Sequence, residues 1–140
     1  QIAKMEGIAH FQAGAYPDAL RAFILFQRIA ERIGDPAHIG AAHNYQSYQY
    51  REMNDVPRCR AAADRAVRIL RALPPDEDLA NALTGLASAV GDQGHLDSAN
   101  LYLREAVSIY AERGNDMSRG SSLLNMTDTL LMLDQPDSAA

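Results

Sequence analysis

The segment Gly94-His95-Leu96-Asp97-Ser98-Ala99 returns in related form at three other places in the chain. The related segments are Gly14-Ala15-Tyr16-Pro17-Asp18-Ala19, Asn54-Asp55-Val56-Pro57-Arg58-Cys59 and Asp134-Gln135-Pro136-Asp137-Ser138-Ala139. Their last residues are all small and follow one another at a constant step of 40 positions: Ala19, Cys59, Ala99 and Ala139. A fixed step of this size indicates an architecture in which one structural unit is stacked several times.

Other positions follow the same step without any insertion or deletion. The columns are Gly7, Ser47, Ala87 and Thr127; Phe23, Ala63 and Leu103; Phe26, Ala66 and Ala106; and Ile29, Ile69 and Ile109. We therefore interpret the 140 residues as one domain of about three and a half repeats. The repeats span approximately residues 1–35, 36–75, 76–115 and 116–140, and the last one is truncated.

Each unit has the pattern of two α-helices joined by a short turn. In the third unit, apolar residues lie three or four positions apart, which is helical spacing: Leu103, Ala106, Val107 and Tyr110. Proline fits the first turn of a helix, glycine with a positive φ ends a helix, and aspartate caps a helix start. Residues of these types stand at the expected boundaries: Pro17 and Pro57, Gly14 and Gly94, and Asp35, Asp76 and Asp116.

The small residues of the repeated columns have a packing explanation. Helices whose axes approach to roughly 8–10 Å leave room only for small side chains at the crossing. One helix pair cannot bury its own apolar face, whereas stacked pairs bury a continuous core. The sequence therefore predicts an all-α fold, an α-solenoid of antiparallel helix pairs. Cys59 occupies one of the small positions, and we interpret it as a packed, inert thiol.

The pattern resembles that of the tetratricopeptide repeat (TPR) family, whose unit has a small residue in the first helix, a glycine at the turn and an alanine early in the second helix. Residues that match the family pattern are Leu83, Leu86, Ala87, Val90, Gly94, Ala99, Leu103 and Ala106 in the third unit, and Gly7, Gly14, Ala19 and Phe23 in the first. The step of 40 exceeds the common repeat of about 34 residues. It resembles the long variety found in bacterial signalling and regulatory proteins and in kinesin light chains. The resemblance implies a right-handed superhelix.

The same resemblance implies that a protein or peptide binds in the concave groove lined by the first helix of each unit. The groove positions that follow from the register are Lys4, Ile8, Phe11 and Gln12; Asn44, Tyr45, Tyr48, Arg51 and Glu52; Asn81, Thr84, Ser88 and Asp92; and Leu124, Asn125, Asp128 and Leu131. Asn44, Asn81 and Asn125 would hold a peptide backbone, as asparagines do in several relatives. Tyr45 and Tyr48 either contact the partner or fill space between the helices.

The second unit departs from the family pattern. His43 and Gln46 stand where the third unit has Leu83 and Leu86. Polar groups that are buried without partners destabilise a fold, so either these two side chains find hydrogen bonds or the second unit packs differently. We favour the first alternative.

Arginines cluster around the second helix of the same unit. Arg60, Asp64, Arg68 and Arg71 fall on one outward face at helical spacing, and the cluster also includes Arg51, Arg58 and Arg65. A solvated convex face explains them most simply. Binding to an acidic partner surface is the alternative, because guanidinium groups pair well with carboxylates.

Composition and charge argue against several function classes. With 13 Lys and Arg against 18 Asp and Glu, the formal net charge is −5, which does not favour binding to nucleic acid or to an anionic membrane. One cysteine cannot form a disulfide framework, and the four histidines do not show metal-ligand spacing. We expect a cytoplasmic protein without a cofactor, a metal site or an enzymatic activity.

The sequence therefore predicts a protein- or peptide-binding TPR scaffold. The chain starts at Gln1 and stops a few residues into a second helix, so we expect it to be a regulatory or interaction segment of a larger bacterial protein. One alternative is a sensor of a peptide or small ligand that controls an attached output module, with a pocket near Tyr45 and Tyr48. Another is self-association as a homodimer through the terminal helix, around Leu123, Leu124, Leu130 and Leu131.

Overall fold

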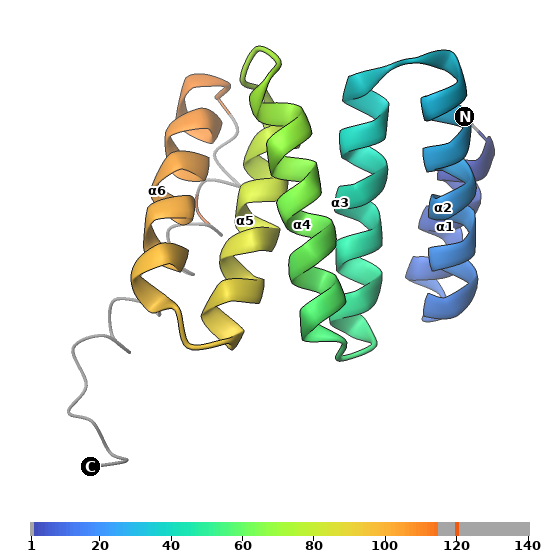
Figure 1. The fold of residues 1–140 in the computed structure, drawn as a ribbon, viewed down its shortest axis with the longest axis horizontal. Coiled ribbons are helices and arrows are strands. Elements are labelled where there is room, and N and C mark those ends of the chain that lie inside the picture. Colours follow the sequence, from blue (N-terminus) through green and yellow to red (C-terminus); the bar gives the residue numbers. More distant parts are fainter. Residues whose placement is uncertain (1, 115–119, 121–140) are drawn as a thin grey trace.

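The computed structural model describes residues 2–114 and 120. Six α-helices make up most of this part of the chain, and it contains no β-strand. The helices are α1 (Ile2–Gln12), α2 (Tyr16–Ile33), α3 (Pro36–Glu52), α4 (Val56–Arg71), α5 (Glu77–Asp92) and α6 (Leu96–Glu112). Each packs against the next one in the chain, and α3 also packs directly against α5. The helices succeed one another along the long axis of the molecule, as expected for an all-α solenoid (Figure 1).

The helix boundaries have the local causes that the sequence suggests. Gly14 and Gly94 end their helices with φ of +75° and +88°, and Asn54 takes the same conformation at the equivalent position, with φ of +59°. Asp35 accepts hydrogen bonds from the backbone N–H groups of Ala37 and His38, which caps α3. The Asp76 carboxylate caps α5 in the same way. The third predicted cap, at position 116, lies outside the described residues.

The columns of small residues lie at the helix crossings. Ala19, Cys59 and Ala99 are all buried, as the step of 40 predicts. Gly7 shows how close the helices approach there, because a Cβ atom at this position would come within 2.6 Å of the Phe23 ring. Only a residue without a side chain fits between α1 and α2 at this crossing.

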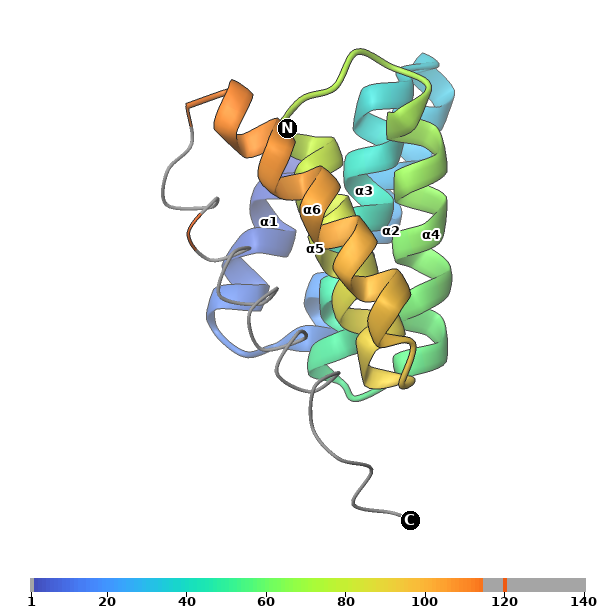
Figure 2. The same cartoon turned by 90° about the vertical axis from the view of Figure 1, so that its left-hand side faces the viewer.

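The buried apolar residues form two clusters. One joins α4, α5 and α6 around Leu83 and Leu103, and the other joins α1, α2 and α3 around Phe23 and Phe26. Between them, α3 buries five polar side chains, namely His43, Asn44, Gln46, Ser47 and Gln49. In the view along the array, α1 lies on one side of α3, while α2 and α4 lie on the other (Figure 2). Helix α3 therefore lies between α1 on one side and α2 and α4 on the other (Figure 2), and five of its buried side chains are polar.

Candidate functional site

A cavity of about 290 Å³ lies on the groove side of α3, between α1, α2 and α3. Its walls are formed by Ile8, Gln12, Phe23, Tyr45, Tyr48 and Gln49. Four of these residues, Ile8, Gln12, Tyr45 and Tyr48, are groove positions expected from the sequence. The volume suits one large side chain or a small aromatic molecule. The lining, mainly apolar with a few polar groups, is typical of ligand pockets.

Tyr45 is held between contacts from two other helices. Its ring stacks on the Phe23 ring of α2, with centroids 4.8 Å apart and an interplanar angle of 10°. The Lys4 ammonium of α1 lies 5.5 Å from the centroid of the same ring, within cation–π range. Half-buried Tyr45 thus presents a fixed aromatic wall to the cavity, and the Lys4 charge lies beside it.

Tyr48 links α3 to α5 through its hydroxyl group. The Asn44 side-chain amide donates a hydrogen bond to the Tyr48 oxygen at 3.3 Å, and the Tyr48 hydroxyl donates to the Asn81 backbone carbonyl at 3.4 Å. The Asn81 side-chain oxygen in turn accepts a hydrogen bond from the hydroxyl of Tyr110. Burial raises the pKa of Tyr48 to about 12, so its hydroxyl remains neutral and keeps this bridging role.

This network changes the interpretation of the asparagines. Asn44 is only 6% exposed, and it lies between α3 and α5 with its amide donated to Tyr48. Asn81 is half-buried and already bonded to Tyr110. The Asn44 amide and the Asn81 backbone carbonyl both bond the hydroxyl of Tyr48, which itself borders the cavity. Asn44 is thus buried within the fold, and the Asn81 side-chain oxygen is occupied by Tyr110.

Two buried side-chain oxygens near the cavity have no hydrogen-bond partner within the described part of the chain. They are Oε1 of Gln49 and Oδ1 of Asn44. Gln49 is 1% exposed, and its amide nitrogen donates to the Tyr45 backbone carbonyl. Buried polar atoms usually find a partner. Gln49 borders the cavity, but its Oε1 atom is itself buried, so the surface of the cavity remains mainly apolar.

Thr84, Ser88 and Arg51 are not among the residues that line the cavity. Thr84 and Ser88 are half-buried on α5, with the Thr84 hydroxyl donating to the Ala80 carbonyl. Arg51 is exposed in the last turn of α3. Phe11 belongs to α1, but its side chain lies outside what the structure describes, as do the four positions of the fourth unit, Leu124, Asn125, Asp128 and Leu131. The leucines proposed for self-association also lie outside the described residues.

The two polar departures of the second unit have different fates. Gln46 donates to the side-chain oxygen of Gln27 at 2.8 Å and to the Phe23 carbonyl at 3.4 Å, so the expectation of a satisfied polar group is confirmed for it. His43 is 6% exposed, and its Nδ1 atom has no hydrogen-bond partner among the described residues. For His43 the expectation is wrong, because no donor or acceptor of α2 or α4 reaches that nitrogen.

The arginine face of α4 is exposed, as the solvated alternative expects, but it also links neighbouring units. Arg68 pairs with Asp64 on the same helix at 2.9 Å. Arg60 reaches Gln93 beyond the end of α5, and Arg71 reaches Glu105 of α6. Exposed pairs of this kind contribute about 0–1 kcal/mol each. They orient the surface more than they stabilise the fold.

Reactive or metal-binding groups do not gather in the described residues. Cys59 is 3% exposed, and burial raises the pKa of its thiol, which disfavours the thiolate that a reactive cysteine needs. Residues 2–114 and 120 contain no group of three or more side chains placed to hold a metal ion.

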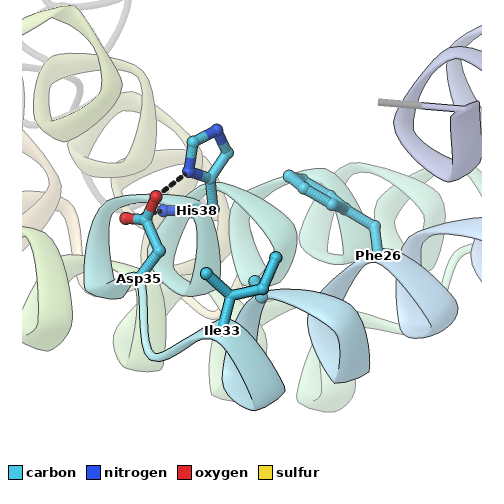
Figure 3. Close-up of a pocket in the computed structure, with 5 residues that line it drawn as sticks. Phe26, Ile33, Asp35 and His38 are labelled. Atoms are coloured by element: carbon cyan, nitrogen blue, oxygen red, sulfur yellow. Dashed lines mark hydrogen bonds and ion pairs between the residues drawn. The ribbon is translucent and has the colours of Figure 1, made fainter.

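A smaller cavity, of about 100 Å³, lies where α2 meets α3. Asp35 and His38 point toward each other at its edge, while Phe26 and Ile33 come from α2 (Figure 3). The Asp35 carboxylate already caps α3 and binds the His38 ring, and this hydrogen bond is the main cause that lowers its pKa. Because its polar groups are engaged in capping, we assign this cavity a structural role.

Within the described part of the chain, no helix has both the length and the apolar character required to cross a bilayer.

Comparison with known proteins supports the fold. No family model matches the chain, and no curated protein matches it. Among solved structures, the chain is similar to a crystal structure of nearly identical TPR-like repeats assigned to a kinesin light chain of Podospora anserina, with a TM-score of 0.76 and 17% sequence identity. The similarity covers 91% of this chain and 63% of that one, so the chain spans less than two thirds of its structural neighbour. The described helices thus form a TPR-like helical repeat.

Proposed function

We propose that this chain binds a protein or peptide in the groove of α1, α3 and α5, and that one large apolar or aromatic side chain of the partner enters the cavity of about 290 Å³. The observation that carries the proposal is the position of this cavity. It opens among Ile8, Tyr45 and Tyr48, residues that the repeat register independently places in the groove. Buried aromatic anchors dominate the energy of many protein interfaces.

The chemistry of the walls supports an aromatic or large aliphatic anchor. The Tyr45 ring and the Ile8 side chain offer apolar surface to such an anchor. Aromatic side chains gain large apolar contact area when they are buried. We include in this proposal the role of an interaction segment in a bacterial regulatory protein, which rests on the long repeat step of 40 residues.

A filled cavity tests the proposal. The chain has no tryptophan, so a single introduced tryptophan both occupies space and reports by fluorescence. Peptides selected from a displayed random library against the wild type are expected to share one aromatic or leucine residue. Ile8→Trp, which fills the cavity, should weaken their binding at least tenfold. Leu25→Trp is the matched control, because Leu25 lies 48% exposed on α2 away from the cavity walls. Equal binding by both variants would refute the proposal.

Ligand sensing is the second candidate, because the cavity is lined by both tyrosines that this alternative requires. The two functions differ in whether contacts outside the cavity contribute to the affinity for the ligand. If the groove binds a peptide, N-acetylphenylalanine amide should bind at least a hundredfold more weakly than a selected dodecapeptide. Comparable affinity of the two compounds would favour sensing of a small ligand.

A further inference from the structure

A second cavity, of about 220 Å³, lies between α3 and α4. Its walls are formed by His43, Gln46 and Tyr50 of α3 and by Arg58, Ala61, Ala62 and Arg65 of α4. Each residue advances about 100° around an α-helix, so positions 43, 46 and 50 lie nearly opposite positions 45 and 48. The cavity is therefore separate from the groove described above and independent of its function.

Two guanidinium groups border this cavity. Arg58 and Arg65 are seven residues apart on α4, or about 10 Å along the helix axis. The Arg58 Nε atom lies 3.6 Å from the Asp55 carboxylate, at the outer limit of an ion pair. Arg65 has no ion-pair partner among residues 2–114. On a chain with a net charge of −5, this wall is a local concentration of positive charge.

On the α3 side, the cavity is bordered by the buried imidazole of His43. His43 is more than nine-tenths buried, and its Nδ1 atom has no partner in the described part of the molecule. Burial lowers the pKa of this imidazole, the nearby Arg65 lowers it further, and Glu31 of α2 opposes both. The ring is therefore neutral near pH 7, with a proton on one of its two nitrogens. A buried atom such as Nδ1 costs stability unless a ligand or water binds it.

The third unit shows that the fold does not require this chemistry. The residues 40 positions later are Leu83, Leu86 and Val90, which are buried in the apolar cluster. Ala62 corresponds to Tyr102, whose larger side chain packs against that cluster, and Arg65 corresponds to Glu105. The second unit thus has more polar residues at three of these positions, a smaller one at position 62 and a basic one where the third unit has an acidic one. A site in the second unit gives these differences one explanation.

We infer that the cavity between α3 and α4 binds a small dicarboxylate. One carboxylate of the ligand pairs with Arg65, the other replaces Asp55 as the partner of Arg58, and His43 donates a hydrogen bond to the first from its other ring nitrogen, Nε2. The short carbon chain between them lies against the methyl groups of Ala61 and Ala62. Guanidinium groups bind planar carboxylates with two parallel hydrogen bonds, and an ion without a carbon chain leaves this alanine surface uncovered.

Calorimetric titration of the full chain with glutarate at pH 7.5 and low ionic strength tests the inference. The wild type is expected to bind one molecule in a saturable manner. Arg65→Glu should weaken binding at least tenfold. The control is Arg68→Glu, which changes the net charge equally on the same helix, at a side chain that is 78% exposed and outside the cavity walls. It should bind glutarate within twofold of the wild type. Equal losses in both variants would show only diffuse attraction and overturn the site.

Two further measurements keep the test decisive if a variant is unstable. Glutarate should shift the imidazole proton resonances of His43 in the wild type, whereas shifts confined to the exposed His10, His38 and His95 would contradict the site. Inorganic phosphate and acetate, titrated under the same conditions, should bind at least tenfold more weakly than glutarate. Phosphate binding as tight as that of glutarate, or no binding of glutarate at all, would overturn the assignment to a dicarboxylate.

Discussion

Helices α3 and α5 occupy equivalent positions in successive units, but they bury different kinds of side chain. All buried residues of α5 are alanine, glycine, leucine or valine. Helix α3 buries five polar side chains, and three of their atoms, on His43, Asn44 and Gln49, have no described partner. Both helices keep a small residue at the crossing, Ser47 in α3 and Ala87 in α5. The comparison shows that the small column is kept in both helices, while the polarity of the other buried positions differs between them.

The largest expected effect separates the two helices by their contribution to stability. Leu83→Ala in α5 should lower the free energy of unfolding by about 2–5 kcal/mol, because it leaves a cavity at a fully buried site. His43→Ala at the equivalent position of α3 should cost less, because it also removes an unpaired polar atom. Urea unfolding measures both values. Leu101→Ala, in the same unit as Leu83 but 64% exposed, is the control and should change stability by less than about 0.5 kcal/mol. A larger loss for His43→Ala would break the comparison.

Two glycines should respond with opposite signs to the same substitution. A Cβ atom on Gly40 of α3 would come within 2.6 Å of Leu70, whereas one on Gly85 of α5 would meet only ordinary contacts, the nearest at 3.5 Å from Tyr48. Gly40→Ala is therefore expected to destabilise the fold by about 1–3 kcal/mol. Gly85→Ala should stabilise it by about 0.5–1 kcal/mol, through the higher helix propensity of alanine. Thermal unfolding of the two variants distinguishes the signs, and a shared sign would contradict the close contact of α3 with α4 at Gly40 or the looser contact of α5 with α3 at Gly85.

The buried histidine of α3 should make stability depend on pH. The pKa of His43 is lowered by burial and by Arg65, so the unfolded chain binds a proton more readily than the folded one. Protonation of His43 therefore does not affect the free energy of unfolding above the unfolded pKa of about 6.5. As the pH falls from there toward the folded pKa, the free energy of unfolding decreases. Between pH 7.5 and 5.5, the wild type should lose more stability than His43→Leu. His95→Gln, a change at an exposed histidine, should keep the slope of the wild type, and a wild-type slope in His43→Leu would refute the assignment.

The smallest expected effect concerns the bridge between the two units. Arg71 of α4 and Glu105 of α6 form an ion pair whose side chains are 48% and 38% exposed. A double-mutant cycle with Arg71→Ala and Glu105→Ala should give a coupling energy of about 0.2–1 kcal/mol. A value above about 2 kcal/mol would mean that charge pairing, and not the buried α5 face, joins the second and third units.

Much of this architecture could be predicted from the sequence, because its causes are local or periodic. The step of 40 residues predicts the helices and the small crossings, and the aspartate caps at positions 35 and 76 follow from chain-local chemistry. The burial of Asn44 could not be predicted, since it depends on how closely α5 approaches α3 at Gly85. The cavity bordered by His43 and Arg65 was not predicted either, although two differences between the units point to it. Histidine stands where the third unit has Leu83, and arginine stands where it has Glu105.

The positions of the groove residues show the same limit. Register placed Ile8, Tyr45 and Tyr48 on one surface, and these residues do border one cavity. Register alone cannot tell that Phe23 of α2 also borders it or that Gln49 contributes a buried acceptor. Those facts depend on how α1 and α2 pack against α3, which is a property of three helices together.

Thermal unfolding of the wild type and of His43→Leu, each with and without glutarate, tests the central claim that α3 gives up stability in favour of binding. The account predicts that His43→Leu melts at a higher temperature than the wild type in the absence of ligand. It also predicts that glutarate raises the melting temperature of the wild type and raises that of the variant less than half as much, since a ligand stabilises only the state that binds it. A variant that melts lower without ligand, or that gains as much from glutarate as the wild type does, would contradict the account.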